Sequence, residues 1–384
     1  MRIDNAELRF LEIPFRLALS HGARSGRLSS DSIVLRLRSR AHEGFGEAVV
    51  REYVSGSLGH GTELEHEAAR LASELLRPLV GRDFSWAEAE SYFAGLSCDR
   101  SALPLLCAVE SAVLSCAVSE RFETDAAADP WTVLGKAPRR ETIVYGAVLP
   151  FVPLDAARLH VGLCARMRMT SLKVKVGQDS TYNAEILALC RTILGDEFDL
   201  RVDANSAWSP SDLDEHLRVC SRFGVRLVEQ PFAVSEGMAA LARLAARGFS
   251  VMADEGVLTA ADVKSLAAAG AAQVLNLRLS KNGGLGRVLA LAAEAEGCGL
   301  SYQLGCMAGE TGILSGMGRL AASLLPEPLY VEGSYDELLL EENIVTPSFS
   351  FGPGGQASIS RAAGMGYRVD ADRLDRFTRA RVAL

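Results

Sequence analysis

From about Glu141 the chain repeats one rhythm, in which short apolar runs alternate with longer Ala-, Leu- and Arg-rich stretches. The apolar runs number eight and are Ile143–Phe151, Ser171–Gly177, Phe198–Asn205, Val225–Phe232, Phe249–Gly256, Ala272–Ser280, Gly299–Cys306 and Pro328–Gly333. Strands that alternate with helices pair in parallel. Eight such units over roughly 190 residues predict a closed (β/α)₈ barrel rather than an open sheet, with an irregular last unit.

The residues before this rhythm form a different pattern. Alternating or helical periodicity predicts strands at Arg2–Ile13, Ser32–Arg38 and Glu43–Val50, the last with glycines at a turn, and helices at Glu63–Leu79 and Leu103–Arg121. Two polar, Gly- and Ser-rich stretches are predicted mobile loops, Ser20–Ser30 and Val54–Gly61. We therefore expect one unit at residues 1–125 and a barrel at residues 140–336. A tail at residues 337–384 is expected to pack back on the N-terminal unit.

The composition excludes several classes of protein. Of 384 residues, 48% are hydrophobic and 23% are charged, which is typical of a globular chain. The net charge of -8, without a basic run, argues against nucleic acid as a partner. No apolar run approaches the roughly 20 residues of a membrane span. Eight cysteines without a C-x-x-C pair predict free thiols in a reducing compartment, and the N-terminus does not resemble a signal peptide, so we expect a cytoplasmic location.

Three carboxylates follow the third, fourth and fifth apolar runs at nearly constant spacing. Asp203 and Glu229 are 26 positions apart, and Glu229 and Asp254 are 25 apart. Equivalent positions on neighbouring barrel strands lie at the same rim, so the three acids are expected to converge. A single acid at such a junction is more often a helix cap, but three in phase are not explained in that way. Because clustered acids repel each other, a hard divalent cation is expected among them, and Mg²⁺ suits oxygen ligands.

Two lysines end the second run. Lys173 and Lys175 share one face of the strand, because side chains alternate with period two. Outward-facing, solvated lysines would be the ordinary interpretation of an edge strand, but a closed barrel has no edge. A desolvated lysine beside a cation loses its proton more easily and then acts as a general base.

These motifs together resemble the enolase superfamily, and within it the muconate-lactonising (mandelate racemase/muconate cycloisomerase-like) subgroup. The motifs are LKVKVG, VDAN, VEQPF, ADE and a GG-containing loop after the sixth run, in that order. The resemblance extends over almost the whole chain and includes the GFGEA stretch near the N-terminus. It implies a modified (β/α)₇β barrel of the TIM type, an N-terminal α+β capping domain and Mg²⁺ as cofactor.

The resemblance also implies roles for individual residues. Asp203, Glu229 and Asp254 are the implied metal ligands, and Asn205 resembles a residue that supports these ligands or contacts the metal through a bridging water. Lys175 resembles the acid/base on one face of the substrate, and Lys173 its electrostatic support. Glu255 is the implied partner of the cation that ends the sixth run. The stretches Ser20–Ser30 and Val54–Gly61 match loops that close over the substrate.

The sequence departs from the subgroup at the end of the sixth run. A second lysine normally stands there, whereas the matching residue here is Arg278, 24 positions after Asp254. Lys281, three residues later, is the other candidate. Arginine keeps its proton far above neutral pH, so it is a poor general base but a good fixed cation. Arg278 therefore favours chemistry with a single base, such as lactonisation or β-elimination.

A second departure lies at the eighth run. Dipeptide epimerases of the superfamily carry D-x-D there, whereas this chain has Glu332-Gly333-Ser334, which disfavours dipeptide epimerisation. Glu332 resembles an acid found near that strand in lactonising enzymes. Cys306, Met307 and Glu310 follow the seventh run and are candidate pocket residues, although Cys306 and Met307 are equally well explained by packing.

Three functions stay open at this point. The first is a cycloisomerase-like isomerase or lyase that uses one base on a small carboxylate. The second is an amino-acid or dipeptide epimerase or racemase in which Lys281 serves the second face. The third is a barrel that keeps the metal and has lost its activity, against which the intact lysine and carboxylate set argues. The substrate is not legible from the sequence, and a homo-oligomer is expected only by analogy with the family.

Overall fold

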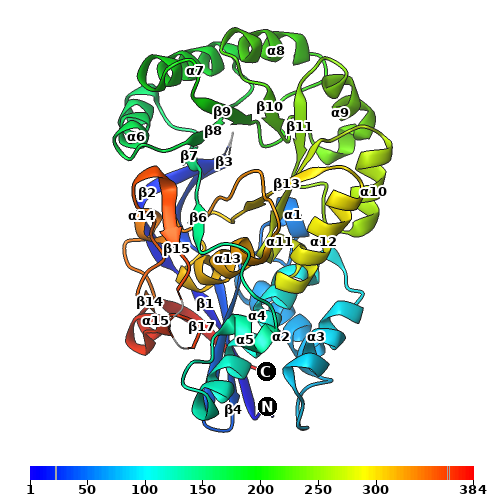
Figure 1. The fold of residues 1–384 in the computed structure, drawn as a ribbon, viewed down its shortest axis with the longest axis vertical. Coiled ribbons are helices and arrows are strands. Elements are labelled where there is room, and N and C mark those ends of the chain that lie inside the picture. The colour runs from blue at the N-terminus through cyan, green and yellow to red at the C-terminus, as the bar shows by residue number, and fades with distance from the viewer. Residues whose placement is uncertain (22–23, 361, 363) are drawn as a thin grey trace.

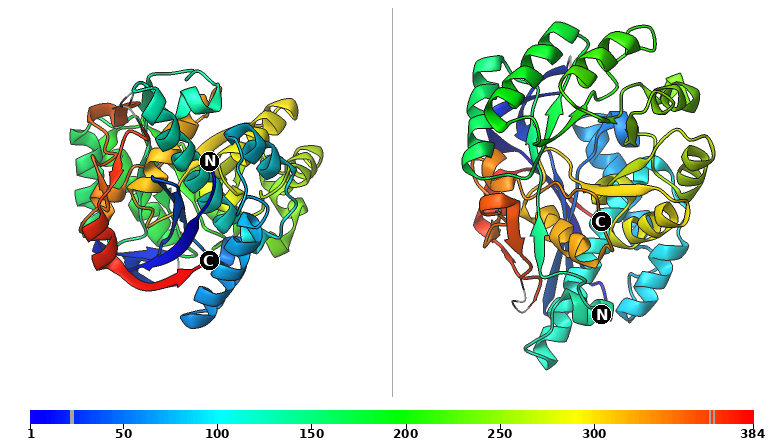
Figure 2. Two further views of the ribbon diagram at one scale, coloured as in Figure 1. Left: turned by 90° about the horizontal axis from the view of Figure 1, so that it is seen from below. Right: turned by 45° about the horizontal axis from the view of Figure 1, so that its top comes forward.

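A computed structural model describes residues 1–21, 24–360, 362 and 364–384 of the chain. Its largest element is a curled parallel sheet, whose strands are surrounded by helices on their outer side (Figure 1). An antiparallel sheet with its own helices lies at the other end of the molecule, where both chain termini are found (Figures 1 and 2). The prediction of a barrel of the (β/α)₇β type with an N-terminal α+β cap is confirmed. The exact domain boundaries stay a prediction.

The parallel sheet has seven strands in the order β13-β12-β11-β10-β9-β8-β7. They are β7 (Ala147–Leu149), β8 (Ser171–Lys175), β9 (Asp199–Asp203), β10 (Leu227–Glu229), β11 (Ser250–Ala253), β12 (Val274–Arg278) and β13 (Ser301–Gly305). The helices between them are α6 (Leu154–Arg166), α7 (Ser180–Leu194), α8 (Leu213–Arg222), α9 (Met238–Ala245), α10 (Ala260–Ala268), and α11 (Leu279–Asn282) with α12 (Leu285–Gly297). Helix α13 (Gly312–Leu324) follows β13.

The eighth apolar run closes the barrel without forming a full strand. Val331 makes a single parallel bridge to Leu304 in β13. Its carbonyl accepts a hydrogen bond of 2.9 Å from the backbone N–H of Gly146, just before β7. Two prolines, Pro326 and Pro328, precede this segment and lack the N–H groups that a longer ladder needs. The irregular last unit expected from the sequence is therefore a one-residue bridge.

Strand register sets the height of the site residues in the barrel. Lys175 pairs with Asp203, and Asp203 pairs with Glu229, so all three lie at one level. Glu229 pairs with Met252, which places Asp254 two residues further toward the rim. Strand β10 is buried along its whole length, as is β12. Burial on both faces explains why these strands appear in the sequence as continuous apolar runs.

The antiparallel sheet has the order β17-β1-β4-β5 and joins the two ends of the chain. Its strands are β1 (Asn5–Leu11), β4 (Ile33–Ser39), β5 (His42–Ala48) and β17 (Thr378–Ala383). Helices α2 (Thr62–Leu76), α3 (Trp86–Gly95) and α4 (Leu103–Thr124) belong to the same end of the molecule (Figure 1). Strand β17 comes from the tail and pairs antiparallel with β1, with Glu7 opposite Ala383.

The expectation of a mobile loop at Ser20–Ser30 is wrong in its secondary structure. Strands β2 (Ile13–His21) and β3 (Arg24–Ser30) form a hairpin there, and Gly22 and Ala23 lie outside the described residues. Polar composition misled the interpretation, because a hairpin outside the main sheet has no need of a buried apolar face. The stretch Val54–Gly61 is less regular: it begins in the short helix α1 (Glu52–Ser55) and ends where α2 starts.

The glycines of the GFGEA stretch were expected at a turn. They lie instead inside β5, against helix α4. A Cβ atom on Gly46 would stand 1.9 Å from the carbonyl oxygen of Ala108, and one on Gly44 would stand 2.2 Å from that of Ala112. Glycine at alternate positions therefore lets the backbone of α4 approach the sheet more closely than any side chain would permit.

Helix α4 also explains the most apolar stretch of the chain. Residues Arg100–Thr124 are long and apolar enough to span a membrane. An 18-residue window within them has a mean hydropathy of 1.8, but 94% of that window is buried inside the protein. The sequence expectation that no stretch reaches this length therefore underestimated α4, which is a core helix. All eight cysteines lie among the described residues and are free thiols, as predicted.

Candidate active site

A cavity of about 400 Å³ opens at the carboxyl ends of the barrel strands. Lys173, Lys175 and Asp203 reach it from β8 and β9, and Arg278 reaches it from β12. Tyr53, from helix α1 of the N-terminal region, closes part of its wall. A site at this rim is where a parallel barrel collects polar side chains, because every strand ends there.

The three predicted carboxylates are deeply buried, with side chains of Asp203, Glu229 and Asp254 at most 1% exposed. Each is held by a cation of the chain. Lys173 Nζ lies 3.0 Å from Glu229 Oε2 and 3.9 Å from Asp203 Oδ2. The Arg278 guanidinium pairs with Asp254 and lies 3.6 Å from Glu229 Oε1. Buried charges require such compensation, since their desolvation is expensive.

Lys173 and Lys175 differ in their surroundings although they share one face of β8. Burial alone would lower the pKa of Lys173, but Glu229 and Glu332 more than offset it, so that its pKa is raised. Burial also dominates at Lys175, where Asp203 opposes it and the neighbouring cations Lys173 and Arg278 add to it, and the pKa of Lys175 is lowered. Lys173 is therefore a permanent cation, and Lys175 gives up its proton more readily.

Asn205 contacts Lys175 directly. Its Oδ1 accepts a hydrogen bond of 2.7 Å from Lys175 Nζ. Asn205 has a φ of 43°, in the left-handed region, and its own backbone N–H donates to Asp203 Oδ1 at 2.9 Å. The Asp203-Ala204-Asn205 turn therefore orients both a predicted metal ligand and the partner of the predicted base.

Arg278 and Lys281 occupy different places. Arg278 lines the cavity, where its Nη1 lies 3.6 Å from the sulfur of Met307. Lys281 belongs to the one-turn helix α11 and is absent from the cavity lining formed by the described residues. Its Nζ donates to Asp254 Oδ1 at 2.9 Å, to the Asp254 carbonyl at 2.7 Å and to the Asn276 carbonyl at 2.5 Å. All three ammonium protons are engaged, so Lys281 braces Asp254 from behind.

Glu255 was expected to pair with the cation at the end of β12, but it does not. Arg278 makes its ion pairs with Asp254 and Glu229 instead. Glu255 is 7% exposed, its Oε2 lacks a hydrogen-bond partner among the described residues, and burial with the nearby charge of Asp254 raises its pKa to about 8. Both acids of the ADE motif follow the end of β11 at Ala253, and of the two only Asp254 forms an ion pair with Arg278.

Glu332 lies within the site and is fully engaged. Its Oε2 accepts from Lys173 Nζ at 2.7 Å, and its Oε1 accepts from Arg201 Nη2 at 2.6 Å. These cations offset the effect of burial, and the pKa of Glu332 is lowered. The carboxylate is therefore an anion that holds Lys173 in place.

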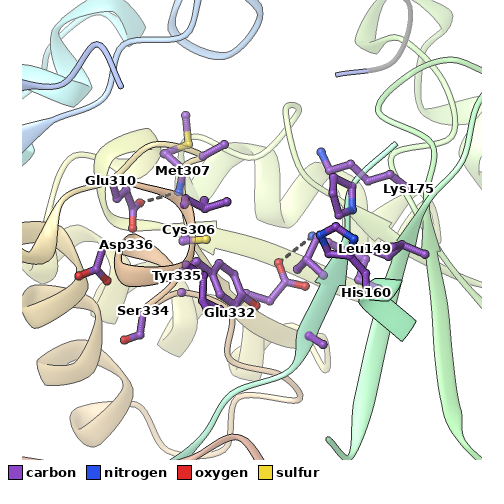
Figure 3. A pocket seen from close by; sticks show the side chains of 18 of the residues that line it. Leu149, His160, Lys175, Cys306, Met307, Glu310, Glu332, Ser334, Tyr335 and Asp336 are labelled. Carbon is purple, nitrogen blue, oxygen red and sulfur yellow. Dashed lines mark hydrogen bonds and ion pairs between the residues drawn. The ribbon is translucent and has the colours of Figure 1, made fainter. Parts of the chain in front are cut away.

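The segment after β13 contributes the other predicted pocket residues. Cys306, Met307 and Glu310 all line the cavity, and Figure 3 shows Glu310 on the side opposite Lys175. Glu310 Oε1 accepts from the Met307 backbone N–H at 2.5 Å. Burial raises the pKa of Glu310 to about 8 and that of the Cys306 thiol well above its usual value, which favours the protonated form of both groups.

Sequence reasoning missed three residues that build this site. Arg201 is completely buried inside the barrel and holds Glu332. Asn276 Nδ2 donates to Glu229 Oε1 at 2.6 Å. Gln230 Oε1 accepts from the backbone N–H groups of Asp254 and Glu255, at 2.8 and 3.1 Å. A polar residue inside an otherwise apolar run was the available signal for Arg201 and Asn276.

The donor set fits a divalent cation such as Mg²⁺. Asp203, Glu229 and Asp254 offer only hard oxygen donors. Burial raises the pKa of Glu229 to about 7, so the cations already present do not fully hold it as an anion. In the described part of the chain, no three acidic, histidine or cysteine side chains stand close enough to form a metal site as they are. Arg278 contacts Glu229 and Asp254 at the same place, so a bound cation would compete with it for these two carboxylates.

Comparison with known proteins places this barrel and its site in a family. A model of the family described as Enolase C-terminal domain-like matches residues 156–373. Muconate cycloisomerase 1 of Pseudomonas putida is 32% identical over 225 residues, which cover 57% of this chain and 58% of that protein. The N-succinylamino acid racemase of Thermus thermophilus is 29% identical over 329 residues, 83% of this chain and 81% of that protein.

A hydrophobic dipeptide epimerase of Enterococcus faecalis is 30% identical over 159 residues, 41% of this chain and 45% of that protein. The chain thus spans about half the length of this relative and of the Pseudomonas enzyme. Among solved structures, an N-succinyl Arg/Lys racemase from Bacillus cereus matches over both whole chains with a TM-score of 0.84 at 18% identity. The muconate lactonizing enzyme from Pseudomonas putida matches with a TM-score of 0.82 at 25% identity, over 99% of this chain and 100% of that one.

The relatives are named as a cycloisomerase, a racemase and a dipeptide epimerase. The chain belongs to the Enolase C-terminal domain-like family and is an enzyme of the enolase superfamily.

Proposed function

We propose that this enzyme transfers a proton at the carbon α to the carboxylate of a small substrate, with Lys175 as its one acid/base. Lys175 removes this proton in a β-elimination or in lactone opening, and returns it in the lactone-forming direction of a cycloisomerisation. The observation that carries the proposal is the position of the strand-end cations. Lys175 and Arg278 line the cavity, whereas Lys281 is turned away from it and engaged by three acceptors. An arginine stays protonated near neutral pH and is therefore a poor general base, which leaves one base for the α-carbon.

Each residue has a distinct part in this proposal. Lys175 takes the proton, and Asn205 fixes its position through their hydrogen bond. Lys173 and Arg278 remain charged and attract the substrate carboxylate into the cavity. Mg²⁺ held by Asp203, Glu229 and Asp254 would supply Lewis-acid stabilisation of the negative charge that develops on the carboxylate. Tyr53 helps to exclude water from above.

Epimerisation or racemisation is the second candidate, because relatives of similar identity are named dipeptide epimerase and N-succinylamino acid racemase. Such a reaction needs a proton donor on the second face of the α-carbon. The position of Lys281 does not support it in that role, so Arg278 or another group would have to deliver the proton. The one-base reaction requires no such donor.

Deuterium exchange separates these candidates. The wild-type enzyme is incubated with Mg²⁺ in D₂O and a panel of muconates, N-acyl amino acids and dipeptides, and mass spectrometry and NMR follow label and products. Ring closure or elimination that depends on Lys175 and yields no inverted, deuterated substrate supports the one-base reaction. Accumulation of an inverted, deuterated epimer contradicts it. Exchange that is equal in wild type and Lys175→Ala contradicts the assignment of the base.

A further inference from the structure

The cavity is chemically two-sided. Lys173, Lys175 and Arg278 supply its positive charge where the strands end. Beyond Lys175, in the direction of Leu149 and His160, the wall becomes apolar (Figure 3). Six residues from β7, α6 and the segments that flank α6 define what we call the α6 side of the cavity: Leu149, Val152, Leu163, Cys164, Met167 and Met169.

Apolar residues from another part of the chain add to this wall. The short helix α14 (Asp336–Leu339) contributes Leu338 and Leu339, and the ring of Phe351 lies on the same cavity. Leu163 and Leu338 are 39% and 52% exposed, so both present apolar surface that is accessible to a ligand. His160 is the polar exception on α6, and its Nδ1 is already 2.9 Å from the Ala156 carbonyl oxygen. This wall thus offers contact area and little hydrogen bonding.

The acids of the cavity do not provide a ready site for an ammonium group. Glu332 is taken by Lys173 and Arg201. Asp336 Oδ1 accepts from Ser315 Oγ at 2.6 Å, and its Oδ2 accepts from Asn343. Glu310 Oε1 already accepts from the Met307 backbone N–H at 2.5 Å, and burial raises the pKa of this carboxyl to about 8. Asp203, the remaining acid of the described lining, lies beside Lys173 and Lys175 at the cationic end. A free amino group on the α6 side would therefore lose its hydration without gaining an anionic partner, which is costly.

We propose that the α6 side binds an alkyl or aryl substituent of the substrate, so that the enzyme acts on carboxylates that carry an apolar group and no free ammonium. The proposal rests on the proposed function only for the placement of the carboxylate at the cationic end. The apolar group leaves water and packs against α6 and α14, and each buried methylene group tightens binding about fourfold.

Binding of unreactive acids tests this without turnover. Straight-chain carboxylates from butanoate to decanoate are titrated into the full-length enzyme with Mg²⁺ by calorimetry, and primary amides of the same lengths serve as uncharged controls. Affinity should rise two- to fourfold per methylene group and level off when the wall is covered, and each carboxylate should bind more tightly than its amide. Affinity that does not depend on chain length overturns the proposal.

Two variants on one helix locate the binding surface. Leu163→Glu places a charge on the cavity wall, whereas Leu159→Glu places it four residues earlier at a position that is 74% exposed and lies outside the described lining. Leu163→Glu should weaken octanoate binding at least tenfold and leave butanoate binding within twofold, and Leu159→Glu should change neither. Equal losses in both variants, or a loss for butanoate as large as for octanoate, contradict the proposal.

The outcome is separate from that of the proposed function. Suppose that affinity depends on chain length, that Leu163→Glu abolishes this dependence, and that no α-proton exchange is detected. The apolar site would then be supported and the proposed reaction contradicted. Lys175-dependent exchange on a substrate whose affinity is insensitive to Leu163→Glu would retain the chemistry and reject the apolar site.

Discussion

The ends of β8 and β12 carry the basic residues of the site, and they are built in opposite ways. At β8 two lysines lie on the same strand face. Lys173 forms ion pairs with Glu229 and Glu332, whereas Lys175 faces the cavity and has a lowered pKa. At β12 the strand ends in Arg278, and the nearby lysine is hidden in α11. One side of the site can therefore give and take a proton, while the other supplies only charge.

Among variants that test the difference between β8 and β12, removal of the base should have the largest effect on activity. Lys175→Ala should lower α-proton exchange by about 10³- to 10⁴-fold, because general-base catalysis contributes on that order. Exchange is measured by NMR in D₂O, with circular dichroism as the check on folding. Exchange that persists in the folded variant at more than a tenth of the wild-type rate would mean that the β8 side does not hold the base.

Lys281 tests whether the hidden lysine is structural. Lys281→Met should lower the free energy of unfolding by about 3–5 kcal/mol, because it removes a buried partner of Asp254. Denaturant unfolding measures this loss. The matched control is Lys264→Met, since Lys264 is 65% exposed and pairs with Glu294 at 3.5 Å, and its loss should be below about 1 kcal/mol. Equal stability of the two variants would contradict the role of Lys281 in holding Asp254.

Arg278→Lys should make the two sides more alike. A lysine in place of Arg278 introduces a second group that can exchange its proton, so an inverted, deuterated substrate should appear at least tenfold faster than with the wild type. Chiral chromatography combined with mass spectrometry detects it. If the wild-type enzyme formed the same epimer at an equal rate, the inference that only the β8 side exchanges a proton with the substrate would be contradicted.

The smallest expected effect concerns the anchor of the β12 side. Glu110 of α4 accepts hydrogen bonds from the backbone N–H groups of Leu285, at 2.5 Å, and Gly286, at 3.0 Å, at the start of α12. Burial raises its pKa to about 7, above the roughly 4.3 of an unfolded chain, so the folded state binds the extra proton between these values. This contribution to stability is present below pH 4.3 and is lost as the pH rises to 7.

Glu110→Gln should therefore flatten the fall in stability across that window, by about 1 kcal/mol per pH unit at most. Denaturant unfolding from pH 4.5 to 7.5 measures the slope. Glu123→Gln is the control, because Glu123 is 63% exposed and its removal should leave the slope unchanged. Parallel pH profiles for wild type and Glu110→Gln would show that Glu110 does not titrate in this range.

Much of the barrel was legible because buried parallel strands appear as apolar runs, and the rim acids follow those runs at one-unit spacing. The place of Lys281 was not legible, since the chain turns into α11 directly after Arg278 and strand alternation no longer applies. The glycines of β5 were misinterpreted for a related reason, because their role depends on helix α4, about 65 residues later in the chain. The hairpin β2–β3 is local, and its polar composition concealed it. Side-chain partners such as Arg201 with Glu332 depend on packing in three dimensions.

The pairing of β17 with β1 also has a consequence for biosynthesis. The first strand of the N-terminal sheet finds one of its two neighbours in residues 378–383, which leave the ribosome after the whole barrel has been made. Until then β1 has one unsatisfied edge, although β4 is available within the first 39 residues. The order of translation therefore makes the cap the first region to begin folding and the last to be completed.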